Sequence, residues 1–126
     1  MTITLNGTTG IQNVLGSAAA PAESNTSNSN TGLYFPTSTT VGISTAGTNA
    51  VTIDTNQRVA FVAGTAALPA ITTNGDTNTG IFFPAADTIA FAEGGAEAMR
   101  IDSSANLQFN SGYGSVTTAY GCRAWD

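Results

Sequence analysis

The sequence contains two copies of one pattern, forty-eight residues apart. Residues 30–43 begin Asn-Thr-Gly-Leu-Tyr-Phe-Pro, and residues 78–91 begin Asn-Thr-Gly-Ile-Phe-Phe-Pro. Extending this offset aligns residues 16–61 with residues 64–109 without a gap, and 16 of the 46 aligned pairs are identical. Self-similarity at such a period is typical of repeat architectures, in which one structural unit recurs along the chain.

The composition is polar but carries few charges. Thr, Gly, Asn and Ser supply 56 of the 126 residues, whereas charged residues make up only 9% and the net charge is -5. Disorder through charge repulsion is therefore not indicated. Large apolar side chains are sparse for a self-sufficient core, so the sequence favours β structure that completes its core with other copies of the chain.

The apolar residues of each copy predict short strands. In the second copy they come in pairs spaced by two residues, which places both members of a pair on one face of a strand. These pairs are Ile81/Phe83, Ile89/Phe91, Met99/Ile101 and Leu107/Phe109. Turn-forming residues separate the pairs at 84–87, 93–96 and 103–106, which is typical of an all-β meander.

The pattern divides the chain into four segments: an N-terminal strand or cap segment at 1–15, β repeats at 16–61 and 64–109, and an aromatic tail at 110–126. In the first segment, Ile3 and Leu5 fall on one face of a first strand, an Asn-Gly turn signal follows, and Ile11 is expected to begin the partner strand of a small hairpin, with a loosely ordered terminus as the alternative. The polar runs 23–30 and 71–78 are interpreted as surface loops.

Residue types needed for catalysis are scarce. The chain has no histidine and no lysine, so an acid–base or nucleophilic constellation is not indicated and we expect no enzymatic activity and no cofactor. Asp54 and Asp102 precede turns at equivalent positions, where we expect each carboxylate to accept backbone N–H bonds. Glu93 and Glu97 are interpreted as solvated turn residues. The single Cys122 is interpreted as a small buried hydrophobe.

Three further classes of ligand are disfavoured. Asn74, Asp76 and Asn78 have alternating oxygen spacing, but the glycine and the bidentate glutamate of a calcium loop are not at the required places. Three arginines are too few to neutralise a nucleic-acid backbone. No apolar run is long enough to span a membrane, and the N-terminus lacks a signal-peptide pattern, so we expect synthesis in a cytoplasm and no membrane insertion.

Longer blocks of sequence resemble a known family. Residues 64–72, 75–91 and 97–104 are similar to repeats of tailed-bacteriophage fibre proteins, especially those of marine phages, and residues 3–11 are similar to the start of such proteins. The resemblance implies an intertwined homotrimeric β-fibre or β-prism located in the virion, with three chains sharing one core. We then expect Phe35, Ile53, Phe83, Phe91 and Ile101 to point at the trimer axis. Thr88 is expected to tolerate replacement by alanine.

Two departures from the family pattern stand out. Family members usually have glycine where Ala105 stands, and we expect Asn106 to take the positive φ itself. Residues 120–125 resemble the start of a longer C-terminal β domain in relatives, whereas this sequence stops at Asp126. The receptor-binding tip or self-cleaving chaperone domain of such relatives is therefore expected to be missing here.

The resemblance leads to one expected function and two alternatives. The expected function is a non-enzymatic virion structural protein, a short trimeric tail fibre or its proximal part, fixed to other virion proteins of the tail or the capsid. One alternative is a capsid decoration or head fibre protein. The other is a module that binds host surface glycans through the aromatic residues of the tail, Tyr113, Tyr120 and Trp125. For this tail, packing of Val116, Tyr120 and Trp125 at the foot of a shared core is the favoured interpretation.

Overall fold

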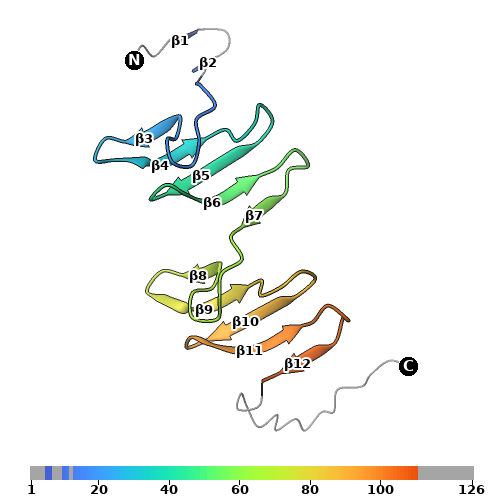
Figure 1. Cartoon of the computed structure of the whole chain (residues 1–126). Coiled ribbons are helices and arrows are strands. Elements are labelled where there is room, and N and C mark those ends of the chain that lie inside the picture. The colour runs from blue at the N-terminus through green and yellow to red at the C-terminus, as the bar shows by residue number, and fades with distance from the viewer. Residues whose placement is uncertain (1–4, 7–9, 12, 111–126) are drawn as a thin grey trace. The chain divides into compact units, whose positions relative to one another are not determined.

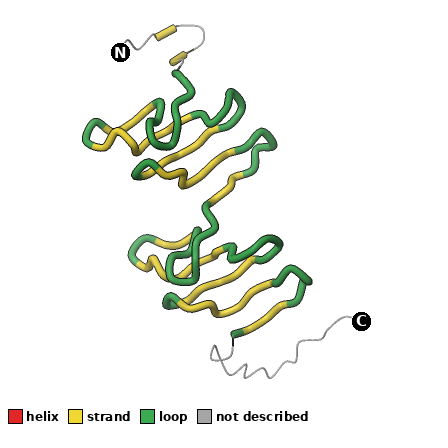
Figure 2. The backbone as a smooth tube through the Cα atoms, viewed as in Figure 1, coloured by secondary structure: helices red, strands yellow, loops and turns green. Residues whose placement is uncertain are grey.

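The computed structural model describes residues 5–6, 10–11 and 13–110, and this part of the chain consists of strands and loops without any helix (Figures 1 and 2). The all-β prediction is therefore confirmed for the described residues. The chain divides into two compact units, Met1–Val62 and Ala63–Asp126. Each unit contains one five-stranded antiparallel sheet.

The first unit begins with a small hairpin. Strand β1 (Leu5–Asn6) pairs with β2 (Gly10–Ile11), with Leu5 opposite Ile11. The five-stranded sheet follows, and its strands lie in the order of the sequence. They are β3 (Glu23–Asn25), β4 (Asn28–Tyr34), β5 (Val41–Thr45), β6 (Thr48–Ile53) and β7 (Val59–Phe61).

The second unit has a sheet with the same strand order and strands of the same lengths. Its strands are β8 (Ile71–Thr73), β9 (Asp76–Phe82), β10 (Ile89–Glu93), β11 (Ala96–Ile101) and β12 (Leu107–Phe109). The predicted apolar pairs lie on these strands, except that Phe83 follows β9 directly. The meander with tight turns is thus confirmed for each unit.

The polar runs 23–30 and 71–78 were predicted wrongly as loops. They form the hairpins β3–β4 and β8–β9, with Asn25 opposite Asn28 and Thr73 opposite Asp76. In the second hairpin the Thr72 hydroxyl contacts the carbonyl oxygens of Asp76 and Thr79, at 2.8 and 2.9 Å. Strands β3 and β8 are exposed at every residue, so they do not need apolar side chains. Thr, Ser and Asn can therefore occupy strand positions here.

The strand register gathers the apolar side chains of each sheet on one side. Ile81 lies opposite Phe91, Phe91 opposite Met99, and Met99 opposite Phe109. We call this side the apolar face. It comprises Leu33, Val41, Ile43, Val51, Ile53, Val59 and Phe61 in the first sheet, and Ile71, Ile81, Ile89, Phe91, Met99, Ile101, Leu107 and Phe109 in the second.

The opposite side of each sheet is partly covered by the segment that leads into the unit. In the second unit Phe82, Ala90 and Ala92 are buried there, and Ala66 packs against them. The entering segment is held by a hydrogen bond from the Phe83 N–H to the Ala63 carbonyl, at 2.8 Å. The buried core of a unit is therefore small, and it lies on the side away from the apolar face.

A β-bulge interrupts the pairing of β10 with β11. Phe91 lies opposite Met99 and Ala92 lies opposite Glu97, so that Ala98 is the extra residue. The first sheet has a matching irregularity after Ile43, with Ala50 at the equivalent place. An extra residue reverses the side on which the following residues lie, and it increases the local twist.

Candidate functional site

The apolar face is the first candidate for function, because much of it is exposed to solvent within the single chain. Phe109 is 57% exposed, and Phe61 and Ile101 are each 42% exposed. A sheet face carrying aliphatic and aromatic side chains normally packs against another layer about 10 Å away. Within the described residues of each unit, the entering segment covers the other side, so the apolar face is open to a partner.

All five residues predicted to form a trimer core fall on or beside the apolar face. Ile53, Phe91 and Ile101 belong to it directly, and Phe35 and Phe83 follow β4 and β9 at the positions that alternate with Leu33 and Ile81. Phe35, Phe83 and Phe91 are half-buried, whereas Ile53 is 40% exposed. Their orientation toward a three-fold axis stays a prediction.

Thr88 was expected to be replaceable without effect, and the structure corrects this expectation. The Thr88 side chain is buried, with 8% of the residue exposed, and its hydroxyl donates to the Ala86 carbonyl at 3.3 Å. Removing this side chain would take a hydrogen bond from the Ala86 carbonyl and leave a gap at a buried position. Thr88 is therefore part of the turn before β10 and is unsuitable as a silent control.

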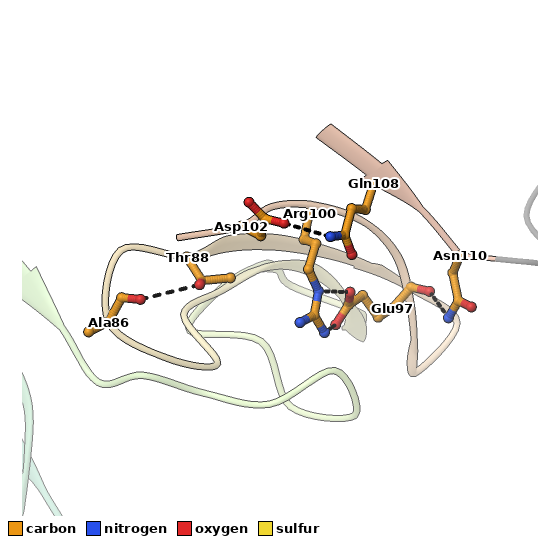
Figure 3. A network of polar contacts seen from close by, with 7 residues as sticks. All are labelled: Ala86, Thr88, Glu97, Arg100, Asp102, Gln108 and Asn110. Carbon is orange, nitrogen blue, oxygen red and sulfur yellow. Dashed lines mark hydrogen bonds and ion pairs between the residues drawn. The ribbon is translucent and has the colours of Figure 1, made fainter. Parts of the chain in front are cut away.

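The second candidate is a polar cluster on the opposite side of the second sheet, formed by Glu97, Arg100, Gln108 and Asn110 (Figure 3). The guanidinium of Arg100 donates to the Glu97 carboxylate through two nitrogen atoms: Nε donates to Oε1, and Nη2 donates to Oε2 at 2.6 Å. The side-chain amide N–H of Asn110 donates a hydrogen bond to the backbone carbonyl oxygen of Glu97 at 2.8 Å. The hydrogen bond with Glu97 is the main cause that raises the pKa of Arg100.

The bulge at Ala98 creates this cluster. Glu97 and Arg100 are three residues apart, a spacing that would place them on opposite faces of a regular strand. Because of the extra residue, Glu97 pairs with Ala92 and Arg100 with Ala90, so both lie on the side opposite the apolar face. The interpretation of Glu97 as a solvated turn residue was therefore wrong, since it lies within β11 and its side chain is only 19% exposed.

The two aspartates at the turns have the structural role predicted for them. Asp102 Oδ1 accepts the backbone N–H groups of Ser104 and Asn106, at 2.9 and 3.0 Å. Asp54 Oδ1 accepts those of Asn56 and Arg58, at 2.8 and 3.0 Å. These bonds favour the ionised form and hold the pKa of Asp102 below its ordinary value, with the bond from Asn106 as the main cause.

The pKa of Asp54 is also lowered, mainly by the hydrogen bond from the Arg58 side chain. Arg58 Nε donates to Asp54 Oδ2 at 2.8 Å. In the second unit, the side-chain amide N–H of Gln108 donates a hydrogen bond to Asp102 Oδ2 at 2.6 Å (Figure 3). Asp102 therefore joins the turn after β11 to the polar cluster.

Several predicted site residues lie outside the described part of the chain: Tyr113, Tyr120 and Trp125, together with Cys122. Among the described residues, no three His, Cys, Asp or Glu side chains are grouped so that they could hold a metal ion. The same part of the chain contains no helix that could cross a membrane.

Comparison of the chain with models of protein families, with curated proteins and with solved structures finds no match. The two surfaces must therefore be interpreted from their own chemistry. The apolar face was foreseen from the two-residue spacing. The polar cluster was missed, and its only signal in the sequence is that these positions differ between the two copies, with Asn49, Thr52, Ala60 and Val62 in the first.

Proposed function

We propose that this chain is a non-enzymatic structural protein of a bacteriophage virion, a short fibre in which three copies share one apolar core. The observation that carries this proposal is the exposed apolar face of each five-stranded sheet. Leaving such a face in contact with water, instead of burying it, costs free energy of the order of 25 cal/mol for each Å² of apolar surface. A partner that covers it therefore stabilises the fold.

Another copy of the same chain is the partner that fits this face best. The face presents aliphatic and aromatic side chains in rows across the strands, and any identical face is complementary to it in hydrophobicity. Charged residues would discriminate between partners, but the rows on β10, β11 and β12 contain none. Three such faces around one axis would bury the rows while the Thr, Ser and Asn side chains stay in contact with water.

The sequence resemblance to phage fibre repeats supports three copies over two. Two copies packed face to face would form a sandwich that also buries the apolar faces. Analytical ultracentrifugation of the purified chain distinguishes these arrangements, and we expect the mass of a trimer. A dimer would reject the fibre arrangement but retain the interface, and a folded 12.7 kDa monomer would reject both.

Strand β7 offers a matched pair of variants for locating the interface. Phe61 belongs to the apolar face, and Ala60, its neighbour on the same strand, points to the opposite side; both residues are exposed in the single chain. We expect Phe61→Asp to dissociate the trimer, because burying an unpaired carboxylate is costly. Ala60→Asp should leave the trimer intact. Dissociation by Ala60→Asp alone would show that the opposite face forms the interface.

A capsid decoration protein would use the same interface between copies. The variants at positions 60 and 61 therefore do not distinguish a location on the tail from a location on the capsid. Both assignments are proposals that rest on the resemblance. Cryo-electron microscopy of the intact particle, with an antibody against this chain as the marker, separates them. We expect labelling at the tail, and labelling over the capsid lattice would replace the fibre assignment with the decoration assignment.

A further inference from the structure

The polar cluster of the second unit lines a pocket that the fold itself does not require. The pocket has a volume of about 510 Å³ and is lined by Glu97, Arg100, Gln108, Phe109 and Asn110. This volume is within the range of small-molecule sites. The pocket lies at the β11–β12 end of the sheet, whereas the entering segment packs against Phe82 and its neighbours on β10.

The first unit serves as an internal control for this conclusion. It forms a sheet of the same strand lengths with Asn49, Thr52, Ala60 and Val62 at the four polar positions. There the Tyr34 hydroxyl donates to Asn49 at 2.7 Å, and Thr52 donates to the same oxygen at 3.1 Å. The strand pairing of the first unit therefore forms without an ion pair at the positions equivalent to 97 and 100, and without amide side chains at the positions equivalent to 108 and 110.

The charges in the pocket favour a neutral ligand. Arg100 is matched by Glu97, and the described part of the second unit carries four other carboxylates but no further basic residue. An anion would be repelled by this excess of negative charge. A free metal cation would meet the guanidinium of Arg100 beside the carboxylate of Glu97, which is unfavourable for it in turn.

The hydrogen-bonding groups of the pocket include both donors and acceptors. Within the described residues, Gln108 and Asn110 each use the amide nitrogen in an internal bond, which leaves the amide oxygen as an acceptor. Arg100 binds Glu97 through Nε and Nη2, which leaves Nη1 as a donor. Sugar hydroxyls can donate and accept at once, so they match a rigid mixture of these two kinds of group.

From this arrangement we infer that the pocket of the second unit binds a residue of a neutral saccharide. The Glu97–Arg100 ion pair positions the guanidinium, and the bond from Gln108 to Asp102 fixes the amide. Because these groups are held by one another, little side-chain freedom is lost when a ligand binds. The pocket residues are other residues of the sequence than the tail aromatics, and the role inferred for them does not depend on the proposed fibre function.

The test uses the full chain and a set of neutral oligosaccharides built from hexoses and from N-acetylhexosamines, with a sialylated oligosaccharide as the acidic comparison. Isothermal titration gives the affinities, and NMR follows the side-chain amide signals of Gln108 and Asn110. We expect saturable binding of at least one neutral oligosaccharide, with shifts of both amide signals. The absence of saturable binding by every neutral member, or binding of the acidic one alone, would overturn the inference.

The variant Gln108→Ala with Asn110→Val copies residues that the first unit already accommodates at these positions. It should weaken binding by about tenfold or more, because two acceptors are lost. Thr55→Ala, in an exposed turn of the first unit, is the control and should bind as the wild type does. Undiminished binding by the double variant would place the site elsewhere. Sedimentation of the same samples shows whether assembly, rather than the pocket, has changed.

Discussion

Ala46 and Gly94 occupy equivalent turn positions in the two units, and both have a left-handed backbone, with φ of 50° and 57°. A side chain in this conformation is strained, whereas glycine is not. The turns are otherwise alike, since the N–H groups of Ala46 and Gly94 donate to the hydroxyls of Thr31 and Thr79. A Cβ atom at Gly94 would have no neighbour within 4 Å, so that backbone strain alone decides the effect of a substitution there.

Reciprocal substitutions at these two positions should have opposite effects. Ala46→Gly removes the strain and should raise the free energy of unfolding by about 0.5–1 kcal/mol, while Gly94→Ala introduces it and should lower that free energy by about 1 kcal/mol. Urea denaturation followed by circular dichroism measures both. Effects of the same sign would show that turn strain does not determine stability here.

Ala105 shows where inference from the sequence fails at this scale. Ala105 itself has a φ of 62°, so the expectation that Asn106 would take the positive φ was wrong. The N–H of Asn106 is instead bound to Asp102 Oδ1, and that bond fixes its conformation. The carboxylate of Asp102 was predicted correctly, and Gln57, at the position equivalent to Ala105, also has a positive φ, of 60°, so the two turns place the left-handed residue at the same point.

The two turn aspartates should make stability depend on pH. The pKa of Asp102 is lower in the folded chain than its ordinary value of 3.8, so its contribution to stability is complete above that value and is lost as the pH falls through the folded pKa. Thermal unfolding between pH 2 and pH 7 should therefore show a decline below about pH 4. Asp102→Asn should flatten the decline, and an unchanged profile would contradict the assignment.

At the scale of the element, the hairpin β8–β9 depends on the close approach of two backbones. Gly80 lies opposite Thr72, and a Cβ atom at Gly80 would come within 2.0 Å of the Ile71 carbonyl oxygen. Gly32 has the same relation to the Glu23 carbonyl in β3–β4, at 1.8 Å. Both glycines belong to the repeated Asn-Thr-Gly, which is therefore explained by strand geometry.

Gly80→Ala should separate β8 from β9 and lower the free energy of unfolding by about 3 kcal/mol or more, because the backbone must move to make room. Thr77→Ala, at an exposed position on the same strand, is the control and should change stability by less than about 0.5 kcal/mol. Amide hydrogen exchange along β8 provides the local measurement. Protection of β8 that is unchanged in Gly80→Ala would show that the strands can separate slightly at no cost.

Elements with apolar alternation could be predicted from the sequence, and the others could not. Ile89 and Phe91 mark β10 because a two-residue period is specific to strands. The hairpin at 71–78 has Ile71 as its single apolar residue and therefore shows no apolar alternation, so that only the strand pairing reveals it. The polar pocket was beyond prediction for another reason, since the bulge at Ala98 reverses the side on which Glu97 lies.

At the scale of the whole chain, the two units share strand order and lengths but differ in surface chemistry. Their common positions include those that shape turns and close contacts, such as Gly32 and Gly80, whereas the four polar positions of the pocket differ. Two units can thus share one strand arrangement while only the second carries the Glu97–Arg100 ion pair and the two amide side chains of the pocket. The likeness between the units identifies structural residues, and the differences identify candidates for recognition.

The proposed association through the apolar face would link the stability of the chain to its concentration. If copies associate only in the folded state, mass action makes dilution equivalent to adding a denaturant. The midpoint of thermal unfolding should then rise with protein concentration in differential scanning calorimetry, and a midpoint independent of concentration would contradict association. If the proposed association is correct, a chain released singly from the ribosome would be at its least stable and would gain full stability only when it binds other copies.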